Sequence, residues 1–122
     1  MQPLVVWTEI PVTDLKKAAD FYAEVFGWTM RITDMGPNEV ATFNALTDAD
    51  EMVVGGHLYP GTPAAGSTIH LALPDRVEAG AERCVAAGGQ VMGPVIEIPQ
   101  GRFQYAADPD GNSIALFDMK AH

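Results

Sequence analysis

The sequence predicts an α+β fold built from two βαβββ modules. A strand pattern, an amphipathic helix pattern and three further strand patterns occur in that order, and the series then starts again. The two copies keep the same spacing, because Asp14 and Asp75 stand 61 positions apart, as do Gly27 and Gly88. Residues 60–66, PGTPAAG, have the composition of a linker between the copies. We therefore expect one domain over 1–122, with module 1 at about 1–59 and module 2 at about 67–122.

The first module opens with a strand and a capped helix. Residues Leu4 to Ile10 are rich in β-branched side chains and tryptophan, which favours a strand. Residues Asp14 to Phe26 carry apolar side chains at helical spacing, with Thr13 or Asp14 as the N-cap and Gly27 as the stop. Three strand-like runs separated by turn residues follow, at Trp28 to Thr33, Val40 to Leu46, and Met52 to Leu58.

The second module repeats this order. A strand is expected at Thr68 to Leu73, and a helix from Asp75 to Ala87, where Asp75 and Glu78 have capping-box spacing. Two strands are expected at Val91 to Ile98 and Phe103 to Ala107. The turn Asp108-Pro109-Asp110-Gly111-Asn112 then leads into a last strand that reaches Phe117, since Pro at the second position and Gly at the fourth suit a type I turn.

Composition narrows the classes of function. The 122 residues are 48% hydrophobic, enough for one core, and no apolar run approaches the length of about 20 residues that a membrane span needs. A formal charge of −9 argues against nucleic acid as a partner. Cys84 is the only cysteine and the N-terminal residues lack a basic segment, so we expect a cytoplasmic protein. A small molecule is the expected partner.

Three stretches carry a resemblance to a known family. They are IPVTDLKKAADFYAEVFGW at 10–28, AAGGQV at 86–91 and DPDGNSIALF at 108–117. With them the chain resembles the vicinal oxygen chelate superfamily, which includes glyoxalase I, extradiol dioxygenases and bleomycin resistance proteins. The resemblance implies a cup-shaped, partly open β-barrel-like sheet with the helices outside, and a homodimer. Whether the modules close within one chain or across a dimer stays open.

The resemblance also implies where a metal would be held. Metal-dependent members use His, Gln or Glu side chains from several strands, which suit a divalent ion. The corresponding positions here are Trp7, Val54 or Gly56, Thr68 or Ile69, and Ala115. None of these is a usual ligand, so we expect no metal and no cofactor. An unusual metal site formed by Glu9, His57 and His70 stays open.

Two functions follow from these residues. The first is metal-free binding of a small hydrophobic or cationic molecule, because aromatic side chains can stack on such a compound. The second is a lyase, isomerase or metal-assisted enzyme with Glu9 and His70 as acid and base. The expected ligand-binding residues are Trp7, Glu9, His70, Phe103, Tyr105, Ala115 and Phe117. The identity of the ligand cannot be predicted from these residues.

Overall fold

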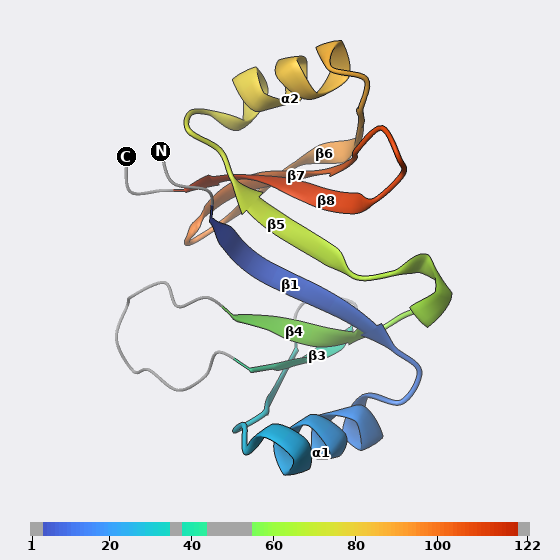
Figure 1. The fold of residues 1–122 in the computed structure, drawn as a ribbon. Coiled ribbons are helices and arrows are strands. Elements are labelled where there is room, and N and C mark those ends of the chain that lie inside the picture. Colours follow the sequence, from blue (N-terminus) through green and yellow to red (C-terminus); the bar gives the residue numbers. More distant parts are fainter. Residues whose placement is uncertain (1–3, 35–37, 44–54, 120–122) are drawn as a thin grey trace. The chain divides into compact units, whose positions relative to one another are not determined.

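The computed structural model describes residues 4–34, 38–43 and 55–119 (Figure 1). The chain divides into two compact units. The first unit comprises residues 7–67, and the second comprises residues 1–6 together with residues 68–122. Each unit has the element order βαβββ, and α+β is therefore the correct fold class.

Among its described residues, the first unit has a four-stranded sheet, one α-helix and a short 3-10 helix, Pro63–Ala65. Its strands lie in the order β2-β3-β4-β1, with β1 and β4 parallel and the other neighbours antiparallel. The elements are β1 (Val5–Val12), α1 (Leu15–Phe26), β2 (Arg31–Asp34), β3 (Glu39–Thr42) and β4 (Gly55–Pro60). Strand β2 begins three residues later than the predicted run. The predicted residues 44–46 and 52–54 lie outside the described part of the chain.

Helix α1 begins and ends where local sequence predicts. Asp14 is extended and its carboxylate accepts a hydrogen bond from the Lys17 N–H at 3.1 Å. Gly27 takes the left-handed conformation, φ 70°, and its N–H donates to the Ala23 carbonyl. The helix packs on one face of the sheet through a core that contains Ala19 and Leu58, both buried (Figure 1).

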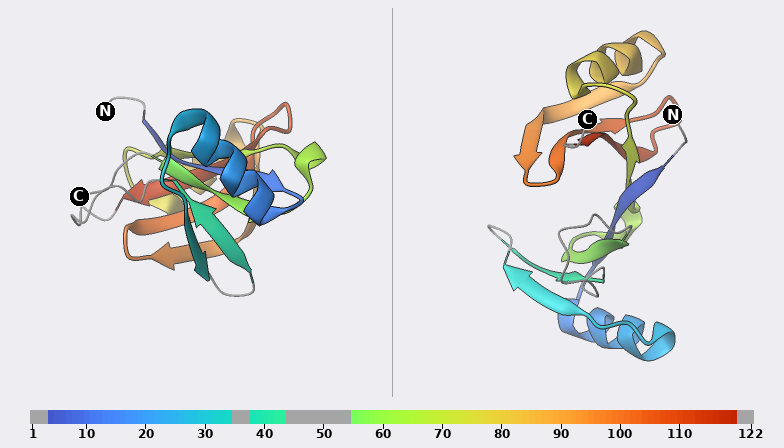
Figure 2. Two further views of the ribbon diagram at one scale, coloured as in Figure 1. Left: turned by 90° about the horizontal axis from the view of Figure 1, so that it is seen from below. Right: turned by 90° about the vertical axis from the view of Figure 1, so that its left-hand side faces the viewer.

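The second unit has the same design. Its strands lie in the order β5-β8-β7-β6, with β5 and β8 parallel. Helix α2 lies over one face of these strands (Figure 2) and buries Val77, Ala106 and Leu116. The elements are β5 (Thr68–Ala72), α2 (Val77–Ala86), β6 (Gln90–Ile98), β7 (Gly101–Ala107) and β8 (Ser113–Met119).

The predicted start of α2 was wrong. The helix begins at Val77, and neither Asp75 nor Glu78 forms a capping box. The Val77 N–H instead donates to the Asp118 carboxylate on β8, at 3.1 Å. Asp75 forms a bidentate salt bridge with Arg83, with both N–O distances at 2.8 Å. A side chain distant in sequence therefore caps this helix, which no local pattern shows.

The turn at Asp108 joins β7 to β8 and sets their register. The Asp108 carboxylate accepts hydrogen bonds from the backbone N–H groups of Asp110 and Asn112 and from the Asn112 side chain. Gly111 has φ 87°, a conformation that glycine adopts without strain. These bonds lower the pKa of Asp108, the Asn112 side chain contributing most. Ala107 consequently pairs with Ser113, and Tyr105 with Ala115.

Replacing Asp108 by asparagine is expected to reduce the loss of thermal stability that occurs as the pH falls into the acid range. Because the folded pKa of Asp108 lies below its ordinary value of 3.8, its stabilising effect is present above that pH and is lost as pH falls through the folded pKa. The neutral amide oxygen of the variant still accepts from the backbone but does not titrate. Thermal melts from pH 6 to about pH 2 should show a smaller loss of Tm for the variant. Parallel curves for the two proteins would contradict this.

Candidate functional site

Three side chains form a row on the face of the first unit opposite α1. Ile10 and Leu58 point toward the helix, so their neighbours in the strands, Glu9 and His57, point the other way. Glu9 pairs with His57 across β1 and β4, and Trp7 stands two residues before Glu9 on the same face. The fold thus brings an indole, an imidazole and a carboxylate together from two parallel strands.

The contacts within this row fix which ring nitrogen carries the proton in the neutral form of His57. The Trp7 indole N–H donates to His57 Nδ1 at 2.9 Å, so that nitrogen must carry a lone pair. In the neutral ring the proton is therefore on Nε2, which faces Glu9 Oε1 at 3.6 Å. This contact is an ion-pair distance and is longer than a hydrogen bond. His57 is thus held between a donor and an acceptor.

The surroundings of the row are partly dry. The side chains of His57 and Glu9 are 13% and 12% exposed. The Tyr59 ring lies edge-on to the His57 ring at 6.1 Å. Burial, and then the negative charge of Glu9, raise the pKa of Tyr59, so its hydroxyl remains protonated at neutral pH. The row can therefore offer a ligand hydrogen bonds and the negative charge of Glu9, beside the aromatic rings of Trp7 and Tyr59.

The second unit gathers aromatic rings around Ala115. Ala115 is fully buried and lies between His70 on β5 and Tyr105 on β7. The His70 ring is 3% exposed and meets three rings edge-on, at 4.9 Å for Phe103 and 5.9 Å for Tyr105 and Phe117. Phe103 and Phe117 stack with their ring centroids 5.9 Å apart. A methyl side chain at position 115 fits this packing.

The predicted site residues are divided between the two units. Trp7 and Glu9 lie in the first unit, and the other five predicted site residues lie in the second. Within its own unit Glu9 contacts His57, a residue that sequence reasoning named only for an unusual metal site. The strand register was the missing signal. The 61-residue spacing matches Glu9 with His70. Glu9 pairs with His57 on the neighbouring strand and His70 pairs with Ala115, so His57 corresponds to Ala115.

The donor set of the implied metal site does not fit a metal. Gly56 points toward α1, where an added Cβ would meet the Phe43 ring, and Val54 lies outside the described residues. The Thr68 hydroxyl is hydrogen-bonded to the Ser113 hydroxyl at 2.6 Å. Trp7 and Ala115 carry no ligand atom. Over residues 4–34, 38–43 and 55–119, no three His, Cys, Asp or Glu side chains gather as a metal site.

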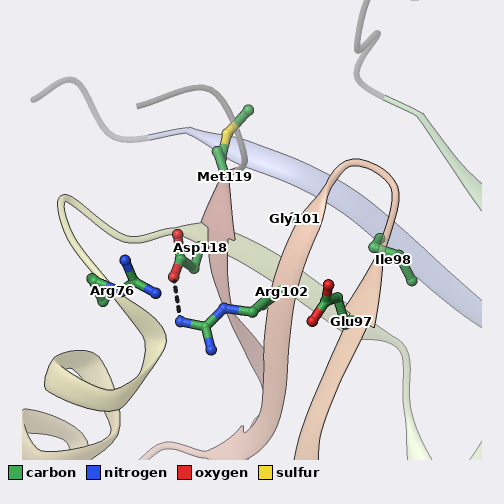
Figure 3. A pocket seen from close by; sticks show the side chains of 7 residues that line it. All are labelled: Arg76, Glu97, Ile98, Gly101, Arg102, Asp118 and Met119. Carbon is green, nitrogen blue, oxygen red and sulfur yellow. Dashed lines mark hydrogen bonds and ion pairs between the residues drawn. The ribbon is translucent and has the colours of Figure 1, made fainter.

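A pocket of about 220 Å³ lies elsewhere, beside the start of α2 (Figure 3). Arg102, which lines the pocket, forms a bidentate salt bridge with Glu78 at 2.8 Å and also donates a hydrogen bond to Asp118 at 3.1 Å. These carboxylates raise the pKa of Arg102 and occupy its guanidinium. Arg102 therefore joins α2 to β8 and is not an open anion site.

Comparison with known proteins gives a consistent picture. Residues 4–116 match the model of the Glyoxalase/Bleomycin resistance protein/Dioxygenase superfamily. A "Glyoxylase-like domain-containing protein" of Didymella fabae is 31% identical over 115 residues, which cover 88% of each chain. "Putative glyoxylase CFP32" of Mycobacterium tuberculosis (strain CDC 1551 / Oshkosh) is 30% identical over 121 residues, 95% of this chain and 46% of the relative. The chain thus spans about half the length of that relative.

Two further matches are more distant in sequence. "Anthracycline biosynthesis protein DnrV" of Streptomyces peucetius is 29% identical over 91% of this chain and 45% of its own. A Streptomyces coelicolor methylmalonyl-CoA epimerase structure shares the fold, with a TM-score of 0.70 at 18% identity over 97% of this chain and 95% of the epimerase.

No helix among the described residues is long and apolar enough to cross a membrane.

Proposed function

The chain belongs to the glyoxalase/bleomycin resistance protein/dioxygenase superfamily, and from this premise we propose that it binds a small hydrophobic or cationic molecule without a divalent metal. The proposal rests mainly on which residue types occupy the positions where the family holds its metal. At three of these positions Trp7, Thr68 or Ile69, and Ala115 stand where the family has His, Gln or Glu, and none of them offers an imidazole or a carboxylate.

Aromatic side chains support an organic ligand. Trp7 and Tyr59 lie on the face opposite α1, while Phe103, Tyr105 and Phe117 lie on the face opposite α2. Rings in such positions bind apolar and cationic groups by stacking and by cation–π attraction. Among the relatives, one is named for anthracycline biosynthesis, which also favours an organic small molecule.

Binding is expected to change tryptophan fluorescence. Trp7 belongs to the row with His57, whereas Trp28 stacks on Phe43 in the packing against α1. A panel of cationic and neutral aromatic compounds should give a saturable change in the wild-type protein and in Trp28→Phe. In Trp7→Phe the change should disappear, while binding measured by calorimetry persists. Flat titrations and flat calorimetry across the panel would contradict the proposal.

Glu9→Gln sharpens this test. The substitution keeps the shape of the side chain and removes its charge. For a cationic ligand we expect about a tenfold loss of affinity, and for a neutral ligand little change. An equal effect on both classes would show that the charge of Glu9 takes no part in recognition.

The contact between Glu9 and His57 favours a second candidate, an acid–base enzyme. A carboxylate 3.6 Å from an imidazole can take and return a proton, and several relatives are named glyoxylases. In this reading His57 takes the role first expected of His70. The candidate predicts turnover that Glu9→Gln abolishes and that a chelator leaves intact. Activity that survives Glu9→Gln would exclude it.

A further inference from the structure

We propose that the indole N–H of Trp7 occupies the place of a metal ion on His57 and closes this position to divalent cations. The inference rests on the proposed metal-free function and supplies its physical basis. It concerns only Trp7, Glu9 and His57, all within the first unit.

The neighbours of His57 resemble those of a metal-binding histidine. Such a histidine gives one ring nitrogen to the ion and turns its other N–H toward a carboxylate or carbonyl, which fixes the ring. His57 turns Nε2 toward the carboxylate of Glu9 at 3.6 Å. Its other nitrogen, Nδ1, accepts the Trp7 N–H at 2.9 Å where an ion would bind. The histidine and its carboxylate are present, and a hydrogen-bond donor takes the place of the ion.

The internal repeat supports this assignment independently. His57 corresponds to Ala115 because the strand partners of Glu9 and His70 are His57 and Ala115. Ala115 stands where the family resemblance places a carboxylate ligand, and Trp7 stands at the ligand position of the first strand. Trp7, at one position of the implied metal site, is therefore hydrogen-bonded to His57, the repeat counterpart of a second position, Ala115.

This bond blocks both nitrogens of His57. A metal requires a free lone pair on the imidazole. The lone pair on Nδ1 is engaged by Trp7, and Nε2 carries the ring proton. The Trp7 ring also lies against the imidazole, with centroids 5.8 Å apart. An ion can reach Nδ1 only after the indole has moved away.

Trp7→His is expected to open the site. The substitution replaces the donor by a second imidazole beside Nδ1 of His57. The purified variant should bind one Zn²⁺ at least about 100-fold more tightly than the wild-type protein in calorimetry. Adding His57→Ala should remove this binding, which excludes the other histidines. Adding Glu9→Gln should weaken it by about 10- to 100-fold, as expected for the carboxylate behind a ligand histidine.

Trp7→Phe is the matched control, because it keeps a large ring and adds no ligand. It should bind Zn²⁺ no better than about tenfold above wild type, since His57 then offers one nitrogen alone. If Trp7→His is folded and binds Zn²⁺ no better than Trp7→Phe, the proposal is wrong. Zn²⁺ binding by the wild-type protein that His57→Ala abolishes would also overturn it.

Nuclear magnetic resonance of the wild-type protein tests the inference without any variant. Imidazole ¹⁵N spectra should show His57 with an unprotonated Nδ1 and a protonated Nε2 at neutral pH, and a coupling from the Trp7 indole N–H to Nδ1. A proton on Nδ1 would overturn the proposal. Ligand titrations in the presence of a chelator test the proposed binding function separately, so the two can fail independently.

Discussion

Gly56→Ala is expected to destabilise the protein by about 3 kcal/mol or more. A Cβ built on Gly56 would overlap the Thr8 carbonyl oxygen and lie 2.7 Å from the Phe43 ring. Gly56 pairs directly with Thr8 across β1 and β4, so the colliding atom belongs to the backbone and cannot rotate away. The two strands must separate, which disrupts hydrogen bonds along the ladder. Urea unfolding of both proteins measures the loss.

The same change should disturb the row of site residues. His57 follows Gly56 and pairs with Glu9, so moving β4 away from β1 carries the imidazole away from Trp7. The indole N–H resonance of Trp7 should therefore shift. Trp28 stacks on the Phe43 ring that the new methyl group meets, so its resonance should shift as well.

Gly80→Ala is the matched control, a buried glycine in α2. The three atoms nearest to its added Cβ all belong to the Leu73 side chain, and the closest is a methyl carbon at 2.6 Å. That side chain can rotate, and alanine favours the helix, so we expect a change below about 1 kcal/mol. If Gly56→Ala is as stable as Gly80→Ala, the close approach of β1 and β4 is not as described.

Features that depend on neighbouring residues could be predicted from the sequence. The ends of α1 are such a case, because Asp14 and Gly27 act on groups three or four residues away. The start of α2 could not be predicted in this way. Its cap, Asp118, lies 41 positions from Val77, and the carboxylates with capping-box spacing pair with arginines instead.

The partner of Glu9 shows the same limit. Sequence alternation placed Trp7 and Glu9 on one face, but naming His57 required the register of β1 against β4. The spacing of 61 positions holds from Ile10 to Leu71, whereas their partners Leu58 and Leu116 are 58 positions apart. The two modules therefore differ by three residues between helix and last strand. A spacing of 61 positions kept along the whole chain matches Ile114 with Val53, which lies outside the described residues. The observed register matches Ile114 with Gly56 instead.

Asp118→Ala is expected to reduce stability by about 3 kcal/mol. Asp118 is 5% exposed, accepts the Val77 N–H at 3.1 Å and contacts Arg102 at 3.1 Å. Removing the carboxylate leaves the first N–H of α2 without its acceptor and Arg102 with only Glu78 among these contacts. Both losses act on one helix end, so they should appear together in urea unfolding and as faster amide exchange at Val77.

Two variants separate the role of this carboxylate from a general effect of acidic residues near α2. Asp118→Asn keeps an oxygen for the Val77 N–H but loses the charge that attracts Arg102, so its stability should lie between those of wild type and Asp118→Ala. Asp75→Ala removes an exposed carboxylate paired with Arg83 and should have little effect. Equal losses in Asp118→Ala and Asp75→Ala would contradict a cap from β8. Because β8 also carries Ala115 and Phe117, loosening this cap is further expected to broaden the resonances of the aromatic cluster around His70.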